Sequence, residues 1–352
     1  MRKVYFGLAI FFIAQFSFAY NPPRAGETFQ SLVSPTAMTY GFSSAGGALF
    51  SASSESIIFN PALITFEQRI TLDGAYTALI SERDENAKKF GSNFLAGIIV
   101  PTKYFSFGAY VDGFFIPLDE MELANSFGAE IAFAKEITTS VSVGGGIKAK
   151  GFWGAGSDWN LAGSIGVLYR RETLAFMKDF RFGVSITELG KNFSRTKLSG
   201  IKAEQNVGTF PMIGTVHAGV AATLFDANLV QGGLSFDLAT PGFQNLLMAL
   251  AFHFSINDAF YMRIAENFNL VETIEKHYNF IPAISVGYSF TFNKRKNNNA
   301  PSSTWENSEM TVNAAWQKLY ESVHVVSANV NVKVGKKDTD APEIELWGET
   351  KE

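Results

Sequence analysis

The sequence has no cysteine and only four histidines among its 352 residues. The absence of cysteine excludes disulfide bridges, thiolate nucleophiles and Cys-ligated metals. The histidines do not show the spacing of a metal site, and the Gly-x-Ser-x-Gly motif of a hydrolase does not occur. They are His217, His253, His277 and His324. We therefore expect neither an enzyme nor a metal or cofactor site.

Charge and long hydrophobic runs are also scarce. The net charge is −4 and no basic stripe is present, so the composition does not support nucleic-acid binding. Beyond residue 19, no stretch approaches the roughly 18 uninterrupted apolar residues of a membrane-spanning helix. A helical protein of the inner membrane is thus excluded. Glycine and phenylalanine are abundant instead, with 31 and 34 copies.

The N-terminus has the three parts of a secretory signal peptide. Residues 1–3 are positively charged at Arg2 and Lys3, residues 4–16 are almost entirely apolar, and Ser17-Phe18-Ala19 forms a small-x-small cleavage site. An uncleaved membrane anchor is the alternative, but the apolar run is only about 13 residues and polar residues follow at once. We predict a cleaved signal peptide over residues 1–19 and export.

Period-two alternation dominates the rest of the chain. Residues 323–334 show it most clearly: apolar side chains at the even positions from 326 onward alternate with Ser, Asn and Lys at the odd positions. Residues 104–113 and 123–136 follow the same pattern. In a transmembrane strand this alternation directs apolar side chains to lipid and small or polar ones to the lumen. It predicts an all-β, transmembrane antiparallel β-barrel over residues 69–335.

Turn residues divide this region into about 14 strands, an even number that suits a closed single-chain barrel. The predicted strands start near residues 69, 92, 104, 123, 138, 157, 179, 211, 228, 244, 259, 279, 309 and 323. Residues 294–308 form a long connection on the side of the short turns, so either that turn is long or the count is off by one. Residues 314–322 could also be a short helix, because Ala, Gln, Lys, Leu and Glu favour helix.

A secreted solenoid, propeller or sandwich would alternate as well. Aromatic residues recur near the predicted strand ends, where membrane barrels carry aromatic girdles, and no fixed-period repeat is visible. Both observations favour the membrane barrel and a location in the bacterial outer membrane, with its lipid as a partner.

Residues 20–68 differ in character from the barrel strands. They are rich in Gly, Ala and Ser but contain Phe42, Phe50 and Phe59, which need a surface to bury against. The barrel interior is the nearest such surface, so we predict an N-terminal plug. A disordered periplasmic lead is the alternative, although the apolar content is high for a solvated linker.

One motif in this segment resembles a known family. Gly46-Gly47-Ala48 followed by Asn60-Pro61-Ala62 is similar to the plug signature of the FadL family, in which an Asn-Pro-Ala triplet precedes 14 barrel strands. Within that superfamily the chain looks most like treponemal FadL-like proteins, which share the segment at residues 315–320 and the tail pattern at 338–344. The resemblance implies an outer-membrane channel for long-chain fatty acids or similar hydrophobes, gated by the plug.

The candidate site follows from the plug and from the inner strand faces. Asn60, Pro61 and Ala62 are expected to gate, because Asn-Pro makes a rigid turn, although Pro61 could merely end the plug. Candidate ligand-lining residues are Phe42, Phe50, Phe59, Tyr110 and Phe114. The alternative function is a structural or partner-binding barrel without transport. The tail, residues 336–352, is a periplasmic extension or linker through which a periplasmic partner could bind.

Overall fold

The computed structural model describes residues 29–41, 43–82, 90–115, 125–153, 157–191, 214–243, 245–274, 281–292, 308–319 and 323–335. The predicted signal peptide, Phe42, His277 and the tail at 336–352 lie outside the described residues, so what the sequence suggests about them stays a prediction. No helix in the described part is long and apolar enough to span a membrane.

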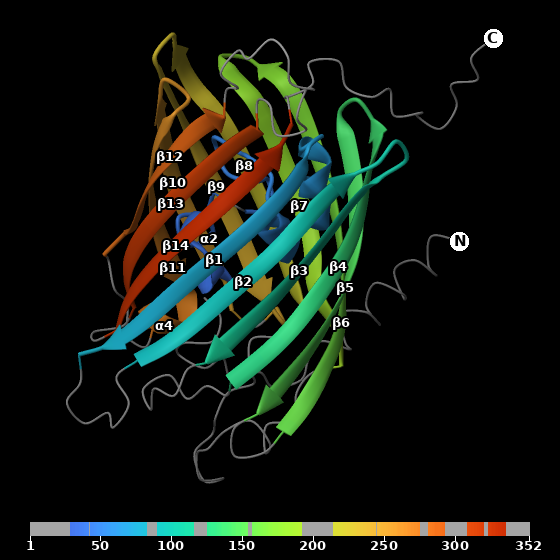
Figure 1. Ribbon diagram of the computed structural model, residues 1–352, viewed down its shortest axis with the longest axis vertical. Coiled ribbons are helices and arrows are strands. Elements are labelled where there is room, and N and C mark those ends of the chain that lie inside the picture. Colours follow the sequence, from blue (N-terminus) through green and yellow to red (C-terminus); the bar gives the residue numbers. More distant parts are fainter. Residues whose placement is uncertain are drawn as a thin grey trace, which may run out of the picture.

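Fourteen antiparallel strands form a closed barrel, in which each strand pairs with its neighbours in sequence and β1 pairs with β14 (Figure 1). The strands are β1 (Ile70–Ser81), β2 (Phe90–Pro101), β3 (Ser106–Phe115), β4 (Asn125–Thr138), β5 (Val141–Trp153), β6 (Ser157–Leu174), β7 (Met177–Lys191), β8 (Thr215–Ala227), β9 (Val230–Pro241), β10 (Leu247–Ile256), β11 (Phe260–Asn269), β12 (Ala283–Phe292), β13 (Ser308–Leu319) and β14 (Val323–Val334). The predicted starts agree with the observed ones to within four residues. The secreted sandwich and propeller are thereby excluded.

The alternation places side chains as predicted. In β14 the even positions from Val326 to Val330 are exposed on the outer surface, whereas Ser327, Asn329 and Asn331 are buried inside. In β3, Tyr110 and Phe114 point inward and Val111 outward. Lipid requires an apolar outer surface. It also requires that every backbone hydrogen bond be satisfied, which closure of the barrel provides.

Exposed aromatic side chains gather near both ends of the barrel. At one end lie Phe90, Phe115, Trp153 and Trp159, and at the other lie Tyr104, Phe105, Tyr169, Phe225, Phe260 and Phe292. Two such girdles mark the membrane interfaces of outer-membrane-type barrels. Phe152 is not part of a girdle, because it points inward and is 2% exposed.

The connections differ at the two ends. At one end, here called the turn end, where Tyr104 and Phe225 lie, the connections are short. Strands β4 and β5 are joined through residues 139–140, β6 and β7 through 175–176, and β8 and β9 through 228–229. The opposite, loop end carries longer connections such as 192–214. The confirmed count of 14 means that the connection between β12 and β13, residues 293–307, is a long one at the turn end.

The helical alternative for residues 314–322 is wrong for its described part, since β13 continues to Leu319. Ala315 and Gln317 face the barrel interior while β13 pairs with β12 and β14 along its length. The helix propensity of these residues favours a helix by only about a few tenths of a kcal/mol per residue, and pairing with two neighbouring strands outweighs it.

Residues 29–41 and 43–66, here called the inner segment, lie inside the barrel and include short helical turns (Figure 1). These are η1 (Phe29–Val33), α2 (Pro35–Met38), η2 (Ser54–Ile58) and η3 (Pro61–Phe66); a further short helix, α4 (Leu270–Ile274), follows β11. Turns η1 and η2 contact β1 and β2, α2 contacts β12 to β14, and η3 contacts β3 to β6.

Candidate functional site

Glycines on the inner wall provide the surface on which the inner segment rests. A Cβ atom added at Gly144 of β5 would lie 2.6 Å from the backbone nitrogen of Ala62 and 2.6 Å from the carbonyl carbon of Pro61. Added at Gly166 of β6 it would overlap Asn60, and at Gly183 of β7 it would overlap the backbone of Ser44. Backbone thus packs directly on backbone, which only glycine permits.

The Asn60-Pro61-Ala62 triplet lies in the middle of this contact. Asn60 is the N-cap of η3: its side-chain oxygen accepts a hydrogen bond of 3.0 Å from the Ala62 amide, and Pro61 occupies the first helical position. The Asn60 side-chain amide donates to the carbonyl of Ser44 at 2.8 Å and to that of Val167 in β6 at 3.2 Å. One side chain therefore starts a helix, joins two turns of the inner segment and holds both to the wall.

An apolar cluster joins the inner segment to strands β1 to β4, β13 and β14. Its members from the inner segment include Leu32, Met38, Ile57, Ile58, Phe59 and Ile64, and its members from the wall include Leu95, Ile99, Tyr110 and Phe114. Three of the five candidate lining residues, Phe59, Tyr110 and Phe114, thus meet in one cluster. Strands β2 and β3 are neighbours and carry large side chains at their inward positions, so these side chains meet on one side of the lumen.

Phe50, another candidate lining residue, is half-buried against this cluster. Its ring meets Phe66 edge-on with 5.4 Å between centroids, and the guanidinium of Arg181 lies 5.3 Å from its centroid. The fifth candidate, Phe42, is outside the described residues. The structure therefore brings the four described candidates together beside the inner segment, and whether they touch a ligand stays a prediction.

Polar contacts also hold the inner segment to strands β1 and β14. Glu55 is fully buried, accepts a hydrogen bond from the Ser34 hydroxyl and contacts the side-chain amide of Asn329 in β14 at 3.4 Å. Asp73 of β1 accepts a 2.7 Å hydrogen bond from the Ser54 amide. Burial, and then repulsion by Asp73, raises the pKa of Glu55 to about 8.

Sequence reasoning missed several residues that hold the inner segment. Arg181 of β7 is fully buried and donates to the carbonyls of Gly47 at 2.6 Å and Ala48 at 2.8 Å. Asp237 of β9 accepts from the Ser44 hydroxyl at 2.5 Å. The signal was present in the alternation, because Arg181 and Asp237 occupy inward positions of their strands, where a charge needs an internal partner.

The histidines of the described part do not converge. His217 contacts Thr187, His253 contacts the carbonyl of Thr39, and His324 contacts Glu82. Among the described residues, no group of three or more His, Asp or Glu side chains has a metal-binding arrangement.

Solved structures with a similar fold include two channels. A deltaS2 mutant of the TodX monoaromatic hydrocarbon channel matches with a TM-score of 0.51 and 11% identity, over 87% of this chain and 98% of its own. The CymD monoaromatic hydrocarbon channel matches with 0.51 and 10%, over 91% and 100%. A FadL homologue from Pseudomonas aeruginosa matches with 0.50 and 9%, over 90% and 99%. No family model matches the chain, and no curated protein matches its sequence.

These findings define the class: a closed, 14-stranded β-barrel of the outer-membrane type, with the fold of these solved structures. More particularly, the chain has the FadL-like fold, as the sequence resemblance predicted. At identities of 9 to 11% the likeness concerns the fold, and the activity has to be argued from this chain's own residues.

Proposed function

We propose that the protein is an outer-membrane channel for passive uptake of long-chain fatty acids or other small hydrophobic molecules, and that the inner segment is its gate. The turn end would then face the periplasm and the loop end the exterior, since short turns and the chain termini of such barrels lie on the periplasmic side.

The apolar cluster between the inner segment and the barrel wall carries this proposal. A general porin has a polar, water-filled lumen. Here the wall presents Leu95, Ile99, Tyr110 and Phe114 to the lumen, and apolar side chains of the inner segment cover them. If the inner segment shifts, an apolar wall is exposed against which a hydrophobe can bury its apolar surface away from water, which is favourable.

The gating role is assigned to Asn60, Pro61 and Ala62, because they link the inner segment to β5 and β6. Phe50 and Phe59 would move with the gate, whereas Tyr110 and Phe114 would stay on the wall. The names of two similar structures, both monoaromatic hydrocarbon channels, support a hydrophobic substrate.

Uptake by whole cells tests the proposal, because the lipopolysaccharide leaflet of a Gram-negative host slows hydrophobes that would cross a plain bilayer. A host that lacks its own fatty-acid channel would express the protein and receive a labelled long-chain fatty acid or a monoaromatic hydrocarbon. We expect saturable uptake that is absent with the empty vector. Heat-modifiable migration on gels would verify insertion of the barrel.

A correctly inserted barrel that takes up neither probe would contradict transport. That result would leave the structural or partner-binding role, in which the same scaffold serves as an assembly platform, adhesin or surface antigen.

A further inference from the structure

Five charged side chains form a cluster on the inner wall near the loop end, here called the polar cluster. It comprises Asp112 of β3, Glu130 of β4, Lys148 and Lys150 of β5, and Glu188 of β7. Each lies within five residues of the loop end of its strand, and each is at most 5% exposed. Three carboxylates against two ammonium groups give the cluster a formal charge of −1.

The two lysines are already engaged. Lys148 pairs with one oxygen of Glu188, Oε1, at 2.7 Å, and Lys150 pairs with Asp112. Glu130 uses both of its oxygens, accepting from the Tyr110 hydroxyl at 2.6 Å and from the Ser164 hydroxyl at 2.8 Å. Two carboxylate oxygens, Asp112 Oδ1 and Glu188 Oε2, have no hydrogen-bond partner in the described part of the protein. The cluster therefore has fewer hydrogen-bond donors than its carboxylate oxygens could accept.

The backbone is distorted to bring Glu188 into this cluster. Between β6 and β7 the register shifts, so that Thr187 and Glu188 together oppose Ser164. Glu188 has a φ of 57°, which is unfavourable for a residue with a side chain, by about 1 kcal/mol or more. As a result both Thr187 and Glu188 turn inward. Bulges of this kind re-aim side chains and are frequent next to functional sites.

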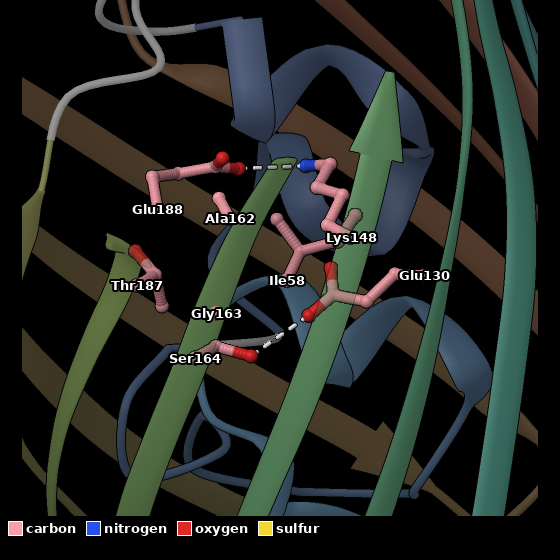
Figure 2. Close-up of a pocket in the computed structure, with 8 residues that line it drawn as sticks. All are labelled: Ile58, Glu130, Lys148, Ala162, Gly163, Ser164, Thr187 and Glu188. Carbon is pink, nitrogen blue, oxygen red and sulfur yellow. Dashed lines mark hydrogen bonds and ion pairs between the residues drawn. The ribbon is translucent and has the colours of Figure 1, made fainter. Parts of the chain in front are cut away.

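A pocket adjoins the cluster, and Figure 2 shows its lining by Glu130, Lys148, Ser164, Thr187 and Glu188 on the wall and by Ile58 of the inner segment. One oxygen of Glu188 is joined to Lys148, and the other carries no interaction (Figure 2). The lining side chains fill the pocket, so none of it admits a water molecule. Ile58 closes the pocket on the side of the inner segment.

We propose that the polar cluster is a head-group site that selects hydrophobes with a hydrogen-bond-donating head, best an ammonium group, over those with a carboxylate. This inference rests on the proposed channel function and narrows its substrate class to the other small hydrophobic molecules, away from fatty acids. An ammonium group in the pocket would donate to the free oxygen of Glu188, which lines it, and would offset the formal charge of the cluster. Its chain would lie against the apolar cluster once Ile58 withdraws. A carboxylate head would add a fourth negative group where neither lysine is free to receive it.

Binding of three matched amphiphiles to the purified, refolded protein tests the selection. Octylammonium, 1-octanol and octanoate share one chain and differ only in the head group, and all are soluble as monomers. Titration calorimetry at pH 7 should give the order octylammonium, octanol, octanoate, with at least a tenfold difference in Kd between the first and the last. This order of affinities is measured on the wild-type protein alone, so the test does not depend on the folding of any variant.

Two variants locate the site. Glu188→Gln removes one carboxylate and should reduce the preference for octylammonium over octanoate at least threefold. The control, Asp226→Asn, removes one carboxylate that pairs with exposed Lys178 at the turn end, and should leave the preference unchanged. Ile58→Ala should tighten binding of octylammonium and octanol, because it opens the pocket.

Tighter binding of octanoate than of octylammonium would overturn the inference, and so would an equal loss of preference in both charge variants. Either result can coexist with saturable uptake in whole cells, in which case the channel function stands and only the head-group selection fails. Absence of binding by all three amphiphiles together with absence of uptake would instead contradict the proposed function itself.

Discussion

Two regions of the inner segment are attached to the barrel in different ways. Ile57 belongs to an apolar cluster with side chains of β2 and β3, such as Ile99, and of β1, β4, β13 and β14. Glu55, two residues earlier, is held by buried hydrogen bonds from Ser34 and from Asn329 of β14. The apolar contact is not directional, so it tolerates sliding, whereas the polar contact fixes one position.

This difference suggests how a segment can be both well packed and releasable. Moving an apolar face along an apolar wall exchanges one partner for another, at a modest cost in free energy. Breaking buried hydrogen bonds costs the full desolvation of the groups left behind, about 1 to 3 kcal/mol each. The buried polar contacts should therefore control release, together with the wall glycines on which the inner segment rests, Gly144, Gly166 and Gly183, here called the glycine seats.

Release can be followed with one introduced cysteine, since the chain has none of its own. Ser56 of η2 is fully buried, so Ser56→Cys is a nearly isosteric reporter whose thiol reacts with a maleimide only when the inner segment detaches. The labelling rate then measures the equilibrium between seated and detached states.

The largest effect is expected from filling a glycine seat. Gly144→Leu would place a side chain where the backbone of Pro61 and Ala62 lies, so the inner segment should detach and labelling should rise at least 100-fold, as for overpacking by about 3 kcal/mol. The adjacent Gly145 faces the outside, where its nearest neighbour would be 3.5 Å away, so Gly145→Leu should label like the parent. Equal labelling of the two variants would refute the seat.

Per pH unit, a smaller effect should come from the titration of Glu55. The pKa of Glu55 is raised to about 8 by burial and by Asp73, from 4.5 in its exposed state. Seating therefore favours the protonated acid: its contribution is fully present below pH 4.5 and is lost as pH rises toward 8. Between these values labelling should rise up to about tenfold per pH unit, after correction for the reactivity of the thiol itself.

The group that faces Glu55 with opposite charge is Arg263 of β11, whereas Ser34 and Asn329 are neutral. Glu55→Gln keeps the shape without the titration, so it should flatten the dependence on pH. A dependence that survives in Glu55→Gln would mean that another group controls release.

The smallest effect separates the two roles of Asn60. Asn60→Ser keeps a neutral side-chain oxygen that can cap η3 but loses the amide that donates to Ser44 and Val167, whereas Asn60→Ala loses both. If the hydrogen bonds to Ser44 and Val167 matter, Asn60→Ser should raise labelling about fivefold to tenfold, from roughly 1 kcal/mol of lost hydrogen bonding. Labelling of Asn60→Ser at the parent rate would show that Asn60 acts as a cap alone.

Sequence reasoning reached the barrel because the alternation is local. In β14 each residue faces lipid or lumen according to its position alone, so Val326 and Ser327 could be assigned without any knowledge of their neighbours. The resemblance at Asn60-Pro61-Ala62 pointed to the correct fold for a related reason, since a cap and a fixed proline dihedral are properties of three consecutive residues.

The missed residues depend on partners distant in the sequence. Glu188 would face outward by alternation, and the bulge that turns it inward arises from pairing between β6 and β7. Likewise, nothing near Gly144 in the sequence shows that Pro61 packs on it.

The sequence by itself determined the number, phase and approximate limits of the strands, and with them an outer surface fit for lipid, because strand period and turn chemistry act over a few residues. Only the tertiary structure decided which inner positions meet the inner segment, where carboxylates and lysines gather, and that Ile58 closes the pocket beside them. Those features depend on closure of the barrel, which brings into contact residues that are far apart in the sequence.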